Sequence, residues 1–279
     1  MLELRLLKGS LMKKVVECMK ELVNEANFDC SSTGISVQTR DSTGSVIVAL
    51  LLRSDGFKHY RCDHNISIGI NLKNMAEMMK CVGNDDIMTT KVDDGGDTVN
   101  FMFESPDKIY DFEIKMVDID SQQYWMSEET EYDATVKMAS SEFARVCRDL
   151  NSGTGTFVIS VSNEAVKFSI EGEDFGCINI VCMNVIFWLI LQPEEASVID
   201  MKEPISLRFA LGYMQSFTNA APLSNTVSIC LSKNLPCLVQ YKITEIGYLR
   251  FYVYPRNTML ERIKRKKENI GFNPYWMLG

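Results

Sequence analysis

Short runs in which apolar and polar residues alternate constrain the fold of this chain more than any other feature of its sequence. The clearest runs are Val99–Phe103, Phe112–Met116, Val166–Ile170, Val227–Leu231, Val239–Ile243 and Leu249–Val253. A period of two places alternate side chains on opposite faces of a β-strand. Turn-forming clusters at 31–34, 93–97 and 245–247 separate such runs. We therefore predict a protein built mostly from antiparallel sheet, each strand with one buried face.

Four segments instead show the three- and four-residue spacing of helices. Ser10 is a candidate N-cap for the first, in which Leu11, Val15, Met19 and Leu22 share a face. The others are expected at about Leu72–Cys81, from Ser140 or Ser141 to Leu150, and at about Phe209–Asn219. Each half of the chain thus reads strand, helix, strands, helix, strands, and a polar acidic stretch separates the halves. We predict an α+β fold of two similar domains, 1–117 and 134–256, joined by a connector, 118–133, and followed by a tail, 257–279.

The residues that carry catalysis or bind metals are sparse. The chain has only two histidines, and its nine cysteines include no CxxC pair. This spacing does not supply the usual four ligands of a structural zinc site, and we interpret the cysteines as reduced, intracellular thiols. A metal pair formed by Cys177 and Cys182 is the alternative. No GxSxG motif or P-loop is present. We therefore expect neither enzymatic activity nor a cofactor.

The distribution of charge is more informative than its sum. With 29 basic and 37 acidic residues the net charge is −8, whereas a DNA-binding protein is usually basic overall. The predicted helices nevertheless carry cations, namely Lys13, Lys14, Lys20, Lys73, Lys80, Arg145 and Arg148. Long cationic side chains on a helix reach DNA phosphates without reading bases. The alternative is a solvated helix face with internal ion pairs, since Glu17 and Glu21 lie on the first helix.

Several long strings settle the comparison with known families. They include GSLMKKVVECMKELVNEANFD (9–29), LLRSDGFKHYRCDHN (51–65), NLKNMAEMMKCVGNDDI (71–87), SSEFARVCRDL (140–150) and LPCLVQYKITEIGYLRFY (235–252). Through these strings the chain resembles the proliferating cell nuclear antigen family of DNA sliding clamps, from Met1 to about Arg256. The resemblance implies three subunits closed head to tail into a ring, with helices lining the hole and sheets outside. It also implies a nuclear, non-enzymatic processivity factor that encircles double-stranded DNA during replication and repair.

The resemblance also implies functional residues. Those expected to contact DNA are Lys13, Lys14, Lys20, Arg61, Cys62, Asp63, His64, Asn65, Asn71, Lys73, Asn74, Lys80, Lys108, Arg145 and Arg148. A replicative polymerase, clamp loader, flap endonuclease and ligase would bind through peptides of the form Q-x-x-(aliphatic)-x-x-(aromatic)-(aromatic). The pocket for these peptides corresponds to Arg40, Gly44, Ile47, Tyr124, Met126, Ser127, Pro236, Tyr252, Val253 and Pro255. The strands at 111–116 and 177–181 match the family's subunit contacts.

The chain departs from the family at several of these surfaces. Glu77 and Asn219 stand where clamps have lysines, and Gly212 replaces an arginine, so the inner positive field should be weaker. At the pocket, Arg40 replaces a methionine and Gly44 replaces a histidine. Ser127 replaces a proline, and Tyr254 replaces an alanine. We expect weaker or altered peptide binding; the alternative is sequence drift with an intact pocket.

Three further departures lie elsewhere. Asn163 replaces the lysine that receives ubiquitin or SUMO, so that switch should be absent. An apolar run, 185–191, stands in place of a polar loop, and a basic tail with Arg262 and 264–267 replaces an acidic one.

The alternatives to a working clamp are a divergent paralogue with weakened or lost DNA loading, and a subunit of the related heterotrimeric checkpoint clamp.

Overall fold

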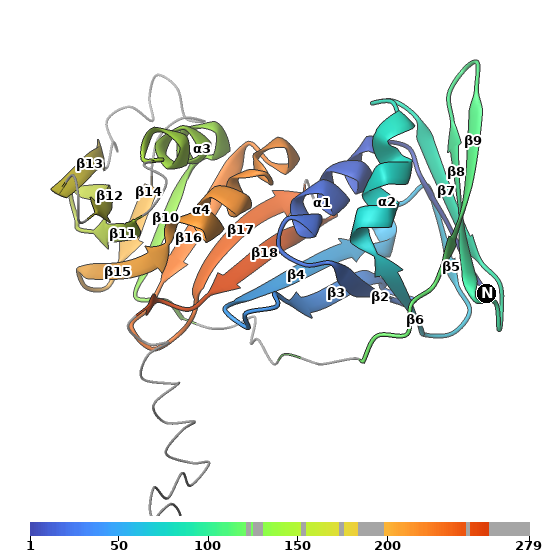
Figure 1. Cartoon of the computed structure of the whole chain (residues 1–279), viewed down its shortest axis with the longest axis horizontal. Coiled ribbons are helices and arrows are strands. Elements are labelled where there is room, and N and C mark those ends of the chain that lie inside the picture. The colour runs from blue at the N-terminus through green and yellow to red at the C-terminus, as the bar shows by residue number, and fades with distance from the viewer. Residues whose placement is uncertain are drawn as a thin grey trace, which may run out of the picture.

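The computed structural model describes residues 1–120, 124, 131–151, 155–172, 176–183, 198–243 and 246–256 (Figure 1). Within these ranges the chain forms antiparallel sheets with helices on one face, as the alternating pattern predicts. The helices are α1 (Ser10–Lys20), α2 (Leu72–Met78), α3 (Ser140–Asp149) and α4 (Leu211–Thr218), with short 3₁₀ turns η1 (Ser54–Gly56), η2 (Met79–Cys81) and η4 (Ala221–Leu223).

A five-stranded sheet flanks one end of the molecule, with strand order β5-β1-β7-β8-β9. Its strands are β1 (Leu2–Leu6), β5 (His59–Cys62), β7 (Ile87–Val92), β8 (Thr98–Glu104) and β9 (Ile109–Lys115). On β8 the alternating residues Val99, Phe101 and Phe103 are all buried, which confirms the sequence pattern. Strand β9 forms the outer edge of this sheet, since its only strand partner among the described residues is β8.

A four-stranded sheet lies at the opposite end, in the order β13-β12-β11-β15. It contains β11 (Thr156–Val161), β12 (Ala165–Gly172), β13 (Gly176–Met183) and β15 (Ile205–Ala210). The three large apolar residues of β12, Val166, Phe168 and Ile170, are fully buried. Among the described strands, β13 is an outer edge here, as β9 is at the other end.

A nine-stranded sheet joins the two halves, in the order β14-β10-β16-β17-β18-β4-β3-β2-β6. From the first half come β2 (Glu25–Ser31), β3 (Gly34–Arg40), β4 (Val46–Arg53) and β6 (Ile66–Asn71). The second half supplies β10 (Ala134–Ala139), β14 (Val198–Met201), β16 (Thr226–Leu231), β17 (Cys237–Ile243) and β18 (Gly247–Val253). The junction is the antiparallel pairing of β18 with β4, in which Tyr252 lies opposite Ile47 and Gly247 opposite Leu52.

The helices lie along one face of this sheet as two pairs, α1 with α2 and α3 with α4 (Figure 1). Their apolar sides complete a core that runs through both halves. Val15 and Met19 of α1, Phe143 and Cys147 of α3, and Phe217 of α4 are each at most 1% exposed. Burial of these large side chains is the main stabilising contribution of the helices.

The helix boundaries correct the sequence prediction at three points. Ser10 is not the N-cap of α1; the cap is Gly9, and the Ser10 hydroxyl donates to the Asn84 carbonyl at 2.7 Å. The second helix ends at Met78 and continues only as η2. Phe209 belongs to β15, because it pairs with Phe157 of β11, so α4 starts two residues later than predicted.

Candidate nucleic-acid interface and partner pocket

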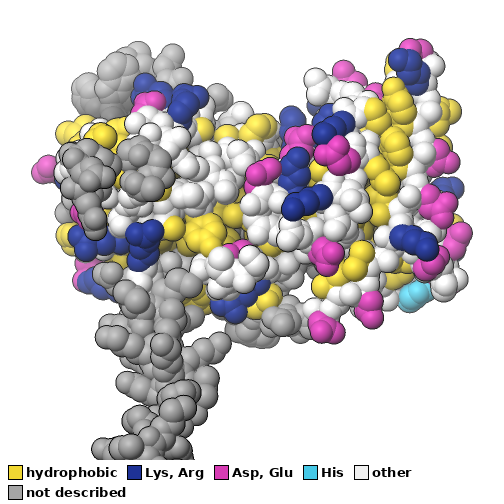
Figure 2. Space-filling view, in the orientation of Figure 1, with side chains coloured by type: hydrophobic (Ala, Val, Ile, Leu, Met, Phe, Trp, Pro, Cys, Tyr) yellow, Lys and Arg dark blue, Asp and Glu magenta, His cyan; other side chains and the backbone are white. Residues whose placement is uncertain are grey.

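The exposed face of the helices carries the cations that the sequence singles out. Figure 2 shows Lys and Arg side chains over α1 and α2 and again over α3, with acidic side chains among them. Lys13, Lys14 and Lys20 are on α1, Lys73 is on α2 and Lys80 on η2, whereas Arg145 and Arg148 are on α3. The structure therefore brings these seven residues to one face of the molecule.

Several of these cations already have intramolecular partners. The Lys13 ammonium donates to the carbonyls of Lys80 and Val82, at 3.2 and 3.0 Å, and so caps the end of the neighbouring helical segment. Lys80 lies 2.6 Å from the Glu77 carboxylate, and Arg145 lies 2.8 Å from Glu142. The hydrogen bond from Lys80 lowers the pKa of Glu77, which keeps this carboxylate charged at neutral pH. These pairs reduce the positive charge available to a phosphate.

Other cations on this face remain available. Within the described residues, Lys14, Lys20, Lys73 and Arg148 have no ion pair and no side-chain hydrogen bond. Helix α4, in contrast, has the sequence LGYMQSFT and carries no charge at all. The positive field is therefore concentrated on α1, the start of α2 and the end of α3.

The remaining residues that we predicted to contact DNA lie away from the helix face or make hydrogen bonds within the protein. Arg61 and Cys62 are on the edge strand β5, and Arg61 bonds to Asp63 of the following turn at 2.8 Å. His64 lies 3.5 Å from Asp94, and neither it nor Asn65 is on a helix. Lys108 is in the β8–β9 turn. Asn71 caps α2 by accepting from the amide of Asn74 at 3.1 Å. The structure does not bring 61–65 to the helix face.

On the opposite, outer face of the nine-stranded sheet lies a second apolar cluster. We call it the outer cluster; it consists of the buried side chains Ile47, Ala49, Leu238 and Tyr252, with Tyr124, Tyr132 and Cys230 packed against them. Strand pairing explains it, because Tyr252 lies opposite both Ile47 on β4 and Leu238 on β17. The cluster thus forms where the two halves of the chain meet.

The outer cluster contains some of the predicted pocket residues. Ile47, Tyr252 and Tyr124 belong to it, and Pro236 and Pro255 are buried just beyond the ends of β17 and β18. Val253 instead faces the main core, because adjacent strand residues point to opposite sides. Met126 and Ser127 lie outside the described residues. Ala49, Leu238 and Tyr132 were not predicted. The two-residue spacing of Ala49 from Ile47 and the position of Leu238 opposite Tyr252 would have found the first two once the strands were paired. Tyr132 precedes β10 and has no such signal.

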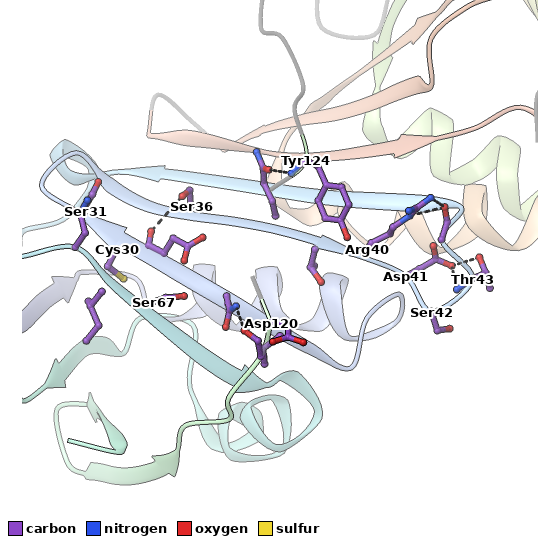
Figure 3. A pocket seen from close by; sticks show the side chains of 18 residues that line it. Cys30, Ser31, Ser36, Arg40, Asp41, Ser42, Thr43, Ser67, Asp120 and Tyr124 are labelled. Carbon is purple, nitrogen blue, oxygen red and sulfur yellow. Dashed lines mark hydrogen bonds between the residues drawn. The ribbon is translucent and has the colours of Figure 1, made fainter. Parts of the chain in front are cut away.

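The loop between β3 and β4 forms the exposed rim beside the cluster. Arg40 bends back so that its guanidinium donates twice to the Gly44 carbonyl, once at 2.8 Å from Nε. Gly44 has a φ of +74°, in the left-handed region that a glycine adopts without strain. A groove of about 1230 Å³ extends from this rim over the outer face of β2 and β3 (Figure 3). Arg40 and Tyr124 stand at one end of the groove, and Asp120 is farther along.

Two family models match the chain. One, described as Proliferating cell nuclear antigen, N-terminal domain, covers residues 1–124; the other, described as Proliferating cell nuclear antigen, C-terminal domain, covers residues 126–256. The chain belongs to the proliferating cell nuclear antigen family. Together the matches span nearly all of the described residues, in the order that the family requires. The predicted membership in this family is therefore confirmed.

Membership in the proliferating cell nuclear antigen family assigns the architecture. The fold is that of a DNA sliding clamp, with two clamp domains, antiparallel sheets and four helices. Clamps of this family are non-enzymatic scaffolds of DNA replication. The two matches meet at residue 125, inside the predicted connector, whereas the exact limits 117 and 134 stay predictions.

Among the described residues of this clamp, no three His, Cys, Asp or Glu side chains gather as a metal site. Cys177 and Cys182 stand five residues apart on β13, so they point to opposite faces and do not form the metal pair considered as an alternative. No described helix combines the length and apolar character needed to cross a membrane. The apolar run 185–191 and the basic tail 257–279 lie outside the described residues.

Proposed function

We propose that three copies of this chain form a ring around duplex DNA and act as a nuclear processivity factor. One observation carries the proposal: two consecutive clamp domains place their helices, with their cations, on one face. Weak contacts of these cations with phosphates suffice, because topological linkage keeps a closed ring on DNA. Such contacts are independent of sequence and sensitive to salt.

The ends of the subunit support head-to-tail closure. Strands β9 and β13 are the outer edges of the two terminal sheets, and a strand edge presents unpaired backbone groups. Exposed apolar side chains accompany them: Ile109 is 66% exposed, and Ile178 and Val181 are 44% and 53% exposed. Pairing of β9 with β13 of a second copy would cover both edges, and the heterologous contact closes into a ring.

Partner recruitment is the second part of the proposal. The buried outer cluster and the groove that begins at its rim lie at the domain junction, where we place the site for a short peptide with aliphatic and aromatic anchors. Polymerase, clamp loader, flap endonuclease and ligase are the expected partners.

A divergent clamp with reduced DNA contact is the alternative, favoured by the engaged cations and by the uncharged α4. Both functions are tested by loading the protein onto nicked circular DNA with a clamp loader and measuring polymerase processivity. Retention on circular DNA and release after linearisation would support the ring. Formation of a trimer without retention would favour the alternative.

A further inference from the structure

A tyrosine on helix α4 reaches the β3–β4 loop, which forms the rim of the predicted peptide pocket. The Tyr213 hydroxyl of α4 donates to Oδ2 of Asp41 at 2.8 Å and also lies 2.8 Å from the Thr43 hydroxyl. The two partners belong to the β3–β4 loop of the first half, 170 or more positions earlier in the chain. The contact therefore crosses the domain boundary.

The Tyr213 ring is itself held in place. It stacks on Phe217 with a centroid distance of 6.5 Å, and Phe217 stacks on Phe251 of β18 at 4.6 Å. Phe217 and Phe251 are fully buried. The hydroxyl is therefore presented to the loop from a ring packed against the rigid core.

Asp41 transmits this contact to the loop backbone. Its Oδ1 accepts from the amides of Ser45 and Val46, both at 2.7 Å, and its Oδ2 accepts from the Thr43 amide at 3.2 Å. One buried carboxylate thus organises the turn, and Tyr213 fixes the orientation of that carboxylate from outside the turn.

The loop leads directly into the predicted pocket. Arg40 and Gly44 form its rim, and Ile47 of the outer cluster follows Val46 by one residue. The loop also touches the other wall, because the Tyr254 amide, just before Pro255, donates to the Ser45 carbonyl at 3.4 Å. A shift of the turn would therefore move both the rim and the start of β4.

We propose that Tyr213 is a positioning residue for the partner-peptide pocket, through its hydrogen bond to Asp41. It acts across the domain junction and does not touch the peptide. The inference rests on the proposed peptide-recruiting function, and it adds a determinant of peptide affinity that lies on an inner helix.

The test compares Tyr213→Phe with Ser216→Ala in the full-length protein. Tyr213→Phe removes only the hydroxyl and keeps the ring stack. Ser216→Ala also removes one hydroxyl from α4, but its 3.0 Å bond goes to the Gly212 carbonyl inside the helix. Two quantities are measured: hydrogen exchange of the Ser45 and Val46 amides, and calorimetric affinity for a Q-x-x-(aliphatic)-x-x-(aromatic)-(aromatic) peptide.

In Tyr213→Phe we expect exchange of the two amides to accelerate, and peptide affinity to fall, each by about tenfold or more, the effect of losing one hydrogen bond to a charged group. Ser216→Ala should match the wild type in both. Unchanged exchange, or faster exchange with unchanged affinity, would overturn the positioning role. Failure of the wild type to bind the peptide would overturn the proposed function instead, and amide exchange alone would then decide whether Tyr213 holds the loop.

Discussion

The carboxylate of Glu77, on α2, lies 2.6 Å from the ammonium group of Lys80, which is three residues later, on η2. Both side chains are well exposed, so the pair contributes little to stability. Its effect is on function, because it neutralises a cation on the face that we assign to DNA. The first prediction follows from this relationship.

Glu77→Gln should strengthen binding to duplex DNA by releasing Lys80. Each added phosphate contact steepens the dependence of log K on log salt concentration by about 0.9. Fluorescence anisotropy with a labelled duplex over a range of salt concentrations measures this slope. Glu164→Gln removes the same charge from the exposed β11–β12 turn and is the control. Equal slopes for the two variants would contradict the assigned role of Glu77.

Gly212 offers a second place to restore charge. Gly212 is exposed, and a Cβ added there has open space around it, so an alanine fits without rearrangement. Gly212→Ala should stabilise the protein by about 0.5 kcal/mol through helix propensity alone. Gly212→Arg should stabilise it less, because a cation near a helix N-terminus opposes the helix dipole, but it should bind DNA more tightly. Thermal unfolding and anisotropy separate the two effects, and equal DNA affinity of both variants would contradict the prediction.

Subunit assembly should depend on the edge of β13. The wild type is expected to be a trimer at micromolar concentration by multi-angle light scattering. Val181→Lys should shift it towards monomer, because burying an unpaired charge at an apolar contact is costly. Leu7→Lys is the matched control, since Leu7 is also 53% exposed but lies outside both edge strands. A monomeric wild type, or a trimeric Val181→Lys variant, would refute the proposed edge pairing.

The rim residue Arg40 should limit peptide affinity. Its guanidinium is committed to the Gly44 carbonyl and presents a charge beside the outer cluster. Arg40→Met should raise affinity for the partner peptide about two- to fivefold by extending the apolar contact. Arg53→Met, at the far end of β4, is the control. Calorimetry measures the difference, and a weaker-binding Arg40→Met variant would show that Arg40 instead contacts the ligand.

Asp41 should make the rim sensitive to acid. Burial alone would raise the pKa of its carboxyl, but hydrogen bonds from Thr43, Val46 and Tyr213 lower the pKa below the ordinary 3.8. A lowered pKa in the folded state means that the stabilisation is complete above about pH 4 and is lost as the pH falls through the folded value. Urea unfolding should show Asp41→Asn less stable than wild type by about 1–3 kcal/mol at neutral pH. The difference should shrink below pH 4; a constant difference would contradict the assignment.

Local patterns in the sequence predicted the strands and helices well, because period and burial are linked within one element. Phe143, Cys147 and Leu150 recur at helical spacing and are all buried. The prediction that Ser10 caps α1 was wrong, because a serine hydroxyl can also donate to a carbonyl far away in the chain, here that of Asn84. Nothing in the sequence near Ser10 or near Asn84 indicates that these two residues form a hydrogen bond.

The candidate site was predictable only in part, for the same reason. The cations on the helices were found, but their partners depend on how the helices pack. Lys13 of α1 binds carbonyls at the end of η2, a contact that spacing along one helix does not encode. The outer cluster likewise depends on the register of β18 against β4, although these strands are far apart in the chain.

The pairing of β18 with β4 has a mechanical consequence. A loaded clamp must first open wide enough to admit DNA. Seven consecutive residue pairs, from Gly247–Leu52 to Val253–Val46, make the middle of the subunit stiff, and the Cys18 thiol adds a contact to the Asn219 carbonyl across the same seam. The junction between the two halves is therefore as continuous as the sheet on either side, where β17–β18 and β3–β4 also pair over seven residues. A ring of such subunits would part where one copy meets the next, and each copy would move as a rigid arc.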